Sequence, residues 1–378
     1  MEFETLCLHA DGNKKDGWGT LTTPVCQTST FVHKGVGVQS EYSYSRLSNP
    51  TRSHLENTVA RLEGGVAAFA FSSRMSALTT VMKLFGANSH IIASDDLYGG
   101  SLRLFNNVCT VEGMSFDFVD TGDISLVQSL IKANTKAIYV ETPSNPLMQV
   151  SDIAALSALA RKSGLLLIVD NTFLTPYFQR PIALGADIVI HSGTKFLGGH
   201  NDALAGFAVA RTAELAERIG YYFKTIGACL APWDCFLIER GIKTLPLRMD
   251  RINCNAKEIA DWLRGRKQVK HVYYAGFADN ARYAVSVKQA TGFGGMVSFE
   301  VESKQLAEKI LANVKVFQYA ESLGGVESLI TYPMLQTHAD VPKNERERRG
   351  INERFLRISV GIENIKDLID DLKQAFAD

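Results

Sequence analysis

The 378-residue chain lacks a long hydrophobic run, a signal-like start and an excess of charge of either sign. No apolar stretch approaches the roughly 18 residues that a membrane span requires, and the first residues contain no apolar segment typical of a secretory signal. The 40 basic and 40 acidic side chains give a formal net charge of zero, whereas nucleic-acid-binding domains are usually strongly basic. We therefore expect a cytoplasmic protein that binds neither membrane nor nucleic acid.

Motifs for disulfide, metal and dinucleotide chemistry are also missing. The six cysteines are scattered without a CxxC pair, which predicts free thiols in a reducing compartment. His191 and His200 lack the spacing of metal ligands, so we interpret both as local hydrogen-bonding residues and expect no metal site. No GxGxxG sequence follows the first predicted strand, and the nearest match, at 292–295, lies near the C-terminus, which argues against a nicotinamide-dependent oxidoreductase.

The order of sequence patterns predicts an α/β protein. Residues 1–53 are rich in Gly, Ser, Thr, Asn and Pro, and we expect them to form an extended arm without a core of its own. From there to about residue 210, short apolar runs alternate with helical patterns, which predicts a mostly parallel sheet covered on both faces. We expect a large domain over 54–240 and a smaller α+β domain over 241–378, with the charged stretch 343–350 as a solvated helix face.

Two predicted strands end in residues with complementary chemistry. One apolar run ends at Asp170, and a second leads to Lys195, which follows the hydroxyls of Ser192 and Thr194. The crevice outside the carboxyl ends of the strands is where open α/β sheets bind ligands. A lysine can form an imine with an aldehyde while hydroxyls hold a phosphate, and a carboxylate can keep a pyridine nitrogen protonated. These requirements are those of pyridoxal phosphate.

Three further polar segments, 72–75, 96–100 and 141–146, also follow predicted strands. Each alone is explained by helix capping or turn formation, but five such clusters at the same ends of successive strands favour a ligand site. A helix that begins at 72–75 would supply free N–H groups to a phosphate. The ring of Tyr98 could stack on a pyridine, and Lys195 would move protons once the substrate amine displaces it.

Several segments resemble the Cys/Met-metabolism family of pyridoxal-phosphate enzymes, in the expected order from about residue 22 to the C-terminus. They are YSYSRLSNPTR, DDLYGG, ETPSNPL, VDNTF, HSGTKFLGGHND, RGIKTLPLRM, AESLGGVESL and LRISVGIE. Members of the family include cystathionine γ-synthase, the cystathionine β- and γ-lyases and methionine γ-lyase. The resemblance implies an aspartate-aminotransferase-type (fold type I) cofactor-binding domain, with a mostly parallel central sheet, followed by a smaller α+β domain.

The resemblance also implies roles for individual residues. Lys195 is expected to be the catalytic Schiff-base lysine, Asp170 the partner of the pyridine nitrogen, and Tyr98 the stacking ring. The residues expected to hold the cofactor are Tyr44, Arg46, Ser73, Arg74, Met75, Tyr98, Asp170, Ser192, Thr194 and Lys195. Tyr44 and Arg46 match a pair that reaches the phosphate in a neighbouring subunit, so a homodimer is expected as the active unit, usually paired into a tetramer.

One cofactor position departs from the family pattern. Glycine usually stands between the serine and Met75, and this chain has Arg74. Glycine lets the backbone approach the phosphate closely, whereas arginine adds a Cβ and a long cation. The guanidinium could point outward, contribute to anion binding or weaken the cofactor site. This departure motivates the alternative of a non-catalytic binding protein built on the same fold.

The expected substrate is a small sulfur-containing amino acid. Arg357 matches the arginine that holds the substrate α-carboxylate, and Asn145 and Ser322 match residues beside the ring and that carboxylate. Glu321 and Arg103 match residues of enzymes that act on cystathionine. We therefore predict a cystathionine lyase of transsulfuration, with β-cleavage favoured over γ-cleavage. The alternative is γ-replacement, by a cystathionine γ-synthase or an O-acyl-homoserine sulfhydrylase.

Overall fold

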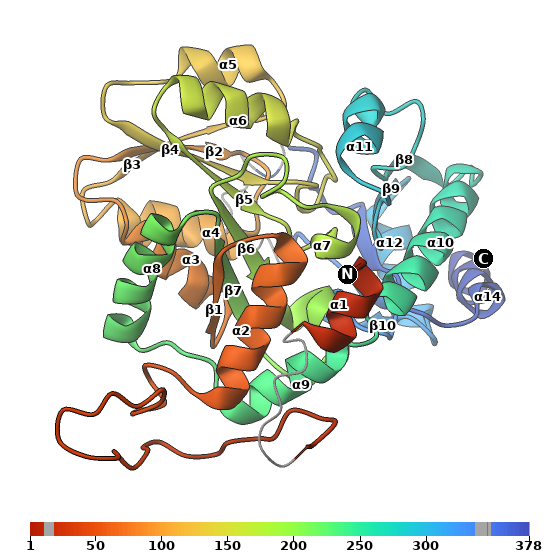
Figure 1. The fold of residues 1–378 in the computed structure, drawn as a ribbon. Helices are drawn as coiled ribbons and strands as arrows, with labels where there is room; N and C mark the ends of the chain where they lie inside the picture. The colour runs from red at the N-terminus through yellow and green to blue at the C-terminus, as the bar shows by residue number, and fades with distance from the viewer. Residues whose placement is uncertain (11–18, 337–345, 347–348, 378) are drawn as a thin grey trace.

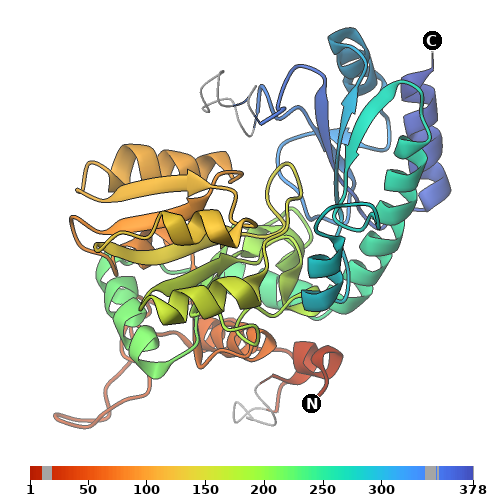
Figure 2. The ribbon, with the colours of Figure 1, turned by 90° about the horizontal axis from the view of Figure 1, so that it is seen from above.

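The computed structural model describes residues 1–10, 19–336, 346 and 349–377, and its strands form two sheets that lie side by side (Figures 1 and 2). The larger sheet has the order β1-β7-β6-β5-β4-β2-β3. Its strands are β1 (Ala67–Phe71), β2 (His90–Ser94), β3 (Ser115–Val119), β4 (Thr135–Glu141), β5 (Leu166–Asp170), β6 (Ile188–Ser192) and β7 (Gly206–Ala210). Strands β3, β2, β4, β5 and β6 pair in parallel, and β7 is antiparallel to both of its neighbours. The predicted mostly parallel sheet is confirmed.

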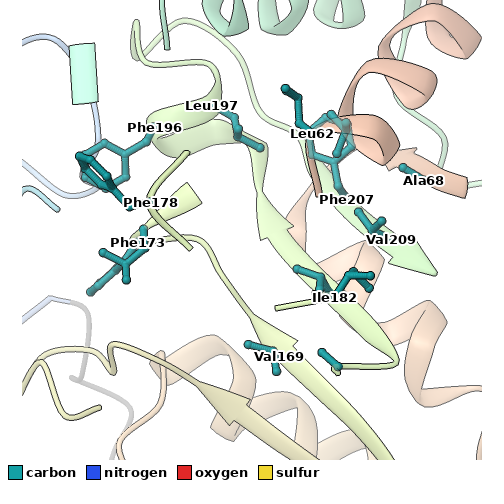
Figure 3. Packing of buried hydrophobic residues seen from close by; sticks show 14 of the residues in the cluster. Leu62, Ala68, Val169, Phe173, Phe178, Ile182, Phe196, Leu197, Phe207 and Val209 are labelled. Carbon is teal, nitrogen blue, oxygen red and sulfur yellow. The ribbon is translucent and has the colours of Figure 1, made fainter. Parts of the chain in front are cut away.

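Both faces of this sheet are buried. Along β5, Leu167 and Val169 belong to one hydrophobic cluster, and the intervening Ile168 belongs to another on the opposite face. This alternation follows from the two-residue period of a strand. Figure 3 shows part of the first cluster, in which Val209 of β7 lies beside Ala68 of β1. A central strand that is apolar on both faces therefore requires helices on both sides.

Helices cover the two faces separately. The helices of this half are α2 (Pro50–Glu63), α3 (Arg74–Met82), α4 (Gly99–Leu104), α5 (Ile124–Ser129), α6 (Ile153–Lys162), α7 (Thr175–Phe178) and α8 (Ala213–Ile226), with π-helical turns η1 (Phe105–Cys109) and η2 (Gly193–Leu197). Residues of α2, α5, α6 and α7 contribute to the first cluster, and residues of α3, α4 and α8 contribute to the second.

The smaller sheet has the order β10-β11-β12-β9-β8 and a hydrophobic cluster of its own. Its strands are β8 (Val269–Tyr273), β9 (Met296–Val301), β10 (Gln318–Tyr319), β11 (Leu329–Thr331) and β12 (Phe355–Ser359). The accompanying helices are α10 (Leu245–Arg264), α11 (Tyr283–Gln289), α12 (Lys304–Asn313) and α14 (Ile365–Phe376), whereas α9 (Pro232–Ile242) packs Cys235, Ile238 and Ile242 into the first cluster. A separate α+β unit follows the large sheet, while the division at residue 240 stays a prediction.

The N-terminal segment extends away from the body of the molecule (Figure 1). Helix α1 (Phe3–His9) packs Phe3 and Cys7 into the first cluster, whereas Leu21 and Val36 further along are fully exposed. Most of the charged stretch 343–350 lies outside the described residues. Within the described part of the chain, none of the helices combines the length and apolar character needed to cross a membrane.

A buried carboxylate joins the last helix to the smaller sheet. Asp371 of α14 accepts hydrogen bonds from the backbone N–H groups of Lys315, Val316 and Phe317, at 2.8 to 3.1 Å. These three donors lie in the turn between α12 and β10, where few other acceptors are within reach of a buried backbone. The contact therefore fixes the position of a helix against the sheet that carries Arg357.

We expect Asp371→Ala to lower the free energy of unfolding by about 3 kcal/mol, because it leaves buried backbone donors without an acceptor. Urea denaturation followed by circular dichroism measures the change. Asp370→Ala is the matched control, because the neighbouring Asp370 side chain is 68% exposed and only pairs with Lys373 on the surface. Equal effects of the two substitutions would contradict the role assigned to Asp371.

Candidate active site

Side chains from both sheets line one pocket of about 320 Å³. The predicted site residues that line it are Ser73, Arg74, Met75, Tyr98, Asn145, Asp170, Ser192, Thr194, Lys195, Glu321, Ser322 and Arg357. The lining residues that were not predicted as site residues are Glu141, Thr172, Phe173, Leu204 and Leu323. Glu141 had a detectable signal, because it opens the ETPSNPL segment at the end of a predicted strand. Leu323 lies within the AESLGGVESL segment, whereas Leu204 had no such signal.

The parallel sheet brings these residues to one edge. Strands β4 and β5 end at Glu141 and Asp170, and these two carboxylates are direct neighbours in the register of the sheet. The adjacent strand β6 ends at Ser192, and the turn η2 that follows it carries Lys195. Parallel strands all present their carboxyl ends on the same side, so this edge collects polar groups from distant parts of the sequence.

Lys195 has the environment of a nucleophilic amine. Its Nζ donates a hydrogen bond to Ser322 Oγ at 2.5 Å, and its backbone leaves the helical conformation, with φ −91° and ψ −134°. Burial, together with the positive charges of Arg357 and Arg74, lowers the pKa of Lys195 to about 8, against a smaller opposing effect of Glu321. A substantial fraction of the amine is therefore uncharged in mildly alkaline solution.

The start of α3 offers an anion site at one end of the pocket. Ser73 is the N-cap residue, and its Oγ accepts a hydrogen bond from Ser76 N at 3.1 Å. Strand β7 passes close to this helix start at Gly206, where a Cβ would lie only 2.2 Å from Ser73 O. The hydroxyl residues Ser192 and Thr194 line the same pocket. Free N–H groups and hydroxyls at a helix N-terminus suit a phosphate.

Arg74 runs from this helix start to the other end of the pocket. Its Nε donates to Asp170 Oδ2 at 2.5 Å, and its Nη2 donates to Glu141 Oε2 at 3.0 Å and to Tyr139 Oη at 2.9 Å. Its Nη1 donates to Ser101 Oγ at 2.8 Å. The side chain is only 8% exposed, so the outward orientation considered from the sequence is wrong.

The carboxylate of Glu141 depends on this guanidinium for its charge. Burial raises the pKa of Glu141 to about 8, and the charge of Asp170 adds to this increase, whereas Arg74 opposes it. Asp170 is equally buried, and its second oxygen accepts a hydrogen bond from Thr172 N at 3.0 Å. Two adjacent buried carboxylates therefore share one cation.

Arg357 lies at the substrate side of the pocket. Its Nη1 donates to Asn145 Oδ1 at 2.8 Å, and its Nη2 donates to Ser322 O at 3.1 Å. The side chain is 1% exposed, and burial lowers its pKa to about 10. Among the described residues, its buried Nε has no hydrogen-bond partner. An unpartnered buried donor of a cation is suited to a carboxylate ligand.

Three predicted site residues lie outside the pocket. Tyr44 and Arg46 belong to the exposed N-terminal arm, where Arg46 Nη1 donates to Lys224 O at 2.5 Å. Arg103 is exposed on α4. The role expected for Tyr44 and Arg46 involves a neighbouring subunit, and the role of Arg103 involves the far end of a substrate. Both roles stay predictions.

The two histidines near the lysine have local partners. His191 Nε2 lies 2.6 Å from Glu63 Oε1, and His200 Nδ1 lies 2.7 Å from Gly198 O. In the ranges that the structure covers, His, Cys, Asp and Glu residues form no group of three that could hold a metal ion. Their positions agree with the local hydrogen-bonding interpretation.

Residues 4–377 match the model of a protein family described as "Cys/Met metabolism PLP-dependent enzyme". The chain belongs to this family. It is 47% identical over 373 residues to the cystathionine beta-lyase of Lactococcus lactis subsp. cremoris (strain MG1363), covering 99% of this chain and 98% of the relative. It is 45% identical over 375 residues to the cystathionine gamma-lyase of Bacillus subtilis (strain 168), covering 99% of both chains.

A solved structure of a cystathionine gamma-lyase from Lactobacillus plantarum, complexed with L-serine, superimposes with a TM-score of 0.98 at 43% sequence identity. The match covers 100% of this chain and 98% of that chain. The protein is therefore an enzyme that uses pyridoxal phosphate, and it has the expected fold type I architecture with a smaller C-terminal domain. The predicted family, fold and cofactor are confirmed.

Most of the pocket fits this cofactor. Lys195 offers a partly uncharged amine, the start of α3 offers N–H groups for the phosphate, and Asp170 is a buried carboxylate for the pyridine nitrogen. Arg74 is the exception, because its guanidinium already occupies Asp170 Oδ2 and lies 5.3 Å from the centre of the Tyr98 ring. The cofactor therefore fits this pocket only with a rearrangement of Arg74.

The lowered pKa of Lys195 predicts the pH dependence of cofactor attachment to the cofactor-free protein. Only the uncharged amine attacks an aldehyde, so the rate constant should rise about tenfold per pH unit below pH 8 and level off above it. Stopped-flow measurement of the bound-cofactor absorbance determines this profile, with Lys195→Ala as a control that should show no such absorbance. An unperturbed lysine would give a rate that continues to rise up to about pH 10.

Proposed function

We propose that this enzyme cleaves a carbon–sulfur bond of L-cystathionine, with β-cleavage to homocysteine, pyruvate and ammonia as the favoured reaction. The observation that carries the proposal is the unpartnered Nε of buried Arg357, in the same pocket as the amine of Lys195. A site with a carboxylate-binding cation and a proton-transferring amine suits an α-amino acid. The relatives described above, a cystathionine beta-lyase and a gamma-lyase, support cystathionine as the substrate.

Arg357 would hold the α-carboxylate of the substrate. Asn145 and the Ser322 carbonyl already fix the two Nη atoms, so the guanidinium is oriented before the substrate arrives. Prior orientation of a binding group reduces the entropy that is lost on binding. The same contacts leave Nε for the ligand and place the substrate Cα on the side of the pocket that contains Lys195.

Lys195 would remove the proton from Cα and later return a proton to the products. Its lowered pKa suits both steps near neutral pH, because a general acid–base group works best when its pKa is close to the operating pH. Ser322 Oγ accepts a hydrogen bond from the amine and so holds it in place. The bound cofactor supplies an electron sink that stabilises negative charge at Cα.

The distal half of cystathionine, with its second amino-acid group, needs space beyond this pocket. A second hollow of about 450 Å³ adjoins the first and shares Thr194, Leu204, Glu321 and Ser322 with it. Asp202 and Glu321 place carboxylates there, which would attract the distal ammonium group. This arrangement supports a long substrate with an ammonium group at its far end over a short thioether amino acid.

Mass spectrometry of the products formed from L-cystathionine by the cofactor-loaded protein tests the proposal. We expect pyruvate and homocysteine. Formation of 2-oxobutyrate and cysteine would replace β-cleavage with γ-cleavage at the same site. If neither 2-oxo acid forms and an activated homoserine ester with cysteine yields cystathionine, the reaction is γ-replacement and the lyase proposal is wrong.

We also infer a homodimer as the active unit, paired into the tetramer expected from the sequence. The N-terminal arm supports this inference, because Leu21, Val32 and Val36 are almost fully exposed on it, and Tyr44 is 45% exposed. An extended segment with exposed apolar side chains is typical of an interface.

A cytoplasmic location is supported by the six cysteines, which are all free thiols.

Mixing two inactive variants tests whether Arg46 acts in a neighbouring subunit. Lys195→Ala lacks the amine, and we expect Arg46→Ala to bind the cofactor weakly because it lacks a phosphate ligand. A mixed dimer of the two would contain one site with both residues intact. Activity should therefore appear when the variants are unfolded together and refolded, and the absence of any recovery would place Arg46 outside the partner's site.

A further inference from the structure

Arg74 is buried with nearly all of its donors in use. A guanidinium has five N–H donors, and four hydrogen bonds connect this one to Asp170, Glu141, Tyr139 and Ser101 at 2.5 to 3.0 Å. Its backbone begins α3, whereas its hydrogen-bond partners include the ends of β4 and β5. The side chain therefore crosses from the phosphate end of the pocket to the end that would hold the pyridine nitrogen.

This one guanidinium contacts two groups that the cofactor ring requires. Its Nε donates a hydrogen bond to one oxygen of Asp170, and Thr172 N donates a hydrogen bond to the other. It also lies 5.3 Å from the centre of the Tyr98 ring, in the range of a cation–π contact. A pyridine ring that stacks on Tyr98 and pairs with Asp170 needs the same two contacts, so the guanidinium and the ring compete.

The charges at this end of the pocket indicate how the competition is resolved. Asp170 and Glu141 are neighbours in the sheet and share the single cation of Arg74. A protonated pyridine brings a second cation, which favours ionisation of Glu141 and so gives two cations for two carboxylates. Arg74 can then keep its hydrogen bonds to Glu141, Tyr139 and Ser101 and give up the one to Asp170. In that arrangement each buried carboxylate has a cation beside it.

We infer that Arg74 is an internal counter-ion of Asp170 in the cofactor-free enzyme, and that the cofactor ring binds by displacing it from that carboxylate while Arg74 keeps Glu141. Arg74 thus lowers the affinity for the cofactor, because it competes with the ring nitrogen for Asp170. The inference rests on the cofactor dependence of the family and not on the reaction proposed above. A failure of the cystathionine assay leaves it unaffected.

A role of Arg74 in phosphate binding is not supported by its contacts. Among the described residues, none of the hydrogen bonds of its guanidinium goes to Ser73, Ser192 or Thr194, which surround the anion site. Its cation is directed to the two carboxylates instead. Only the backbone of Arg74, at the first turn of α3, lies at the phosphate end.

Equilibrium titration of the cofactor-free protein with pyridoxal phosphate, followed by absorbance, tests the inference. Arg74→Met keeps an unbranched chain without the charge, so its dissociation constant should fall about tenfold or more, as expected when a charge-assisted competitor is removed. Arg74→Lys is the matched control, because it keeps a cation beside the carboxylates and should change the affinity much less. An unchanged or weaker affinity in Arg74→Met, or an equal gain in Arg74→Lys, would overturn the inference.

Titration with pyridoxal, which lacks the phosphate, separates the two ends of the pocket. Because Arg74 acts at the ring nitrogen, Arg74→Met should tighten pyridoxal binding by the same factor as pyridoxal phosphate binding. If the substitution weakens pyridoxal phosphate binding and leaves pyridoxal binding unchanged, Arg74 is a phosphate ligand and the inference is wrong.

Thermal denaturation provides a measurement that does not depend on catalysis. Cofactor-free Arg74→Met should melt at a lower temperature than the wild type, because two adjacent buried carboxylates lose their cation. Cofactor should then raise its melting temperature by more than it raises that of the wild type, because tighter binding gives a larger stabilisation. An equal or smaller rise would contradict the inference. If Arg74→Met does not fold, Arg74→Gln, which is also neutral, serves for all three measurements.

Discussion

A buried guanidinium at the pocket connects the two sheets of this enzyme. Arg357 belongs to β12 of the smaller sheet, and its hydrogen bond to Asn145 reaches the loop after β4 of the larger sheet, 212 residues away in the sequence. Its second contact, to the Ser322 carbonyl, holds the residue whose hydroxyl accepts a hydrogen bond from Lys195. Arg357, proposed to bind the substrate carboxylate, is thus linked through Ser322 to Lys195, the proposed catalytic amine.

Charge in this pocket is concentrated on buried side chains. The cations of Arg74 and Arg357 and the burial of the site all lower the pKa of Lys195. The same burial acts on Glu141 in the opposite direction, because desolvation always disfavours the charged form. A fold that collects these groups at one edge of a sheet thus gives an amine that can attack and carboxylates that need a cation.

Arg74 shows how one substitution in a family pattern acquires a structural role. A glycine at this position leaves the pocket open, whereas arginine must find partners for a buried charge. The neighbouring ends of β4 and β5 provide two carboxylates, and Tyr139 and Ser101 provide two hydroxyl groups. In the absence of the cofactor, Arg74 thus forms a stable set of contacts. One of them is to Asp170, the carboxylate proposed to pair with the cofactor ring.

The sequence by itself predicted the parallel sheet, the positions of Asp170 and Lys195 at strand ends, and the cofactor. These properties depend on local patterns: an apolar run defines a strand, and the polar residue that follows it lies at the strand end. The direction of the Arg74 side chain, the inclusion of Leu204 in the pocket, and the contact between Arg357 and Asn145 were decided only by the tertiary structure. Each of these depends on which distant strands become neighbours, because a buried charge takes its partners from whatever side chains the packing brings within hydrogen-bonding distance.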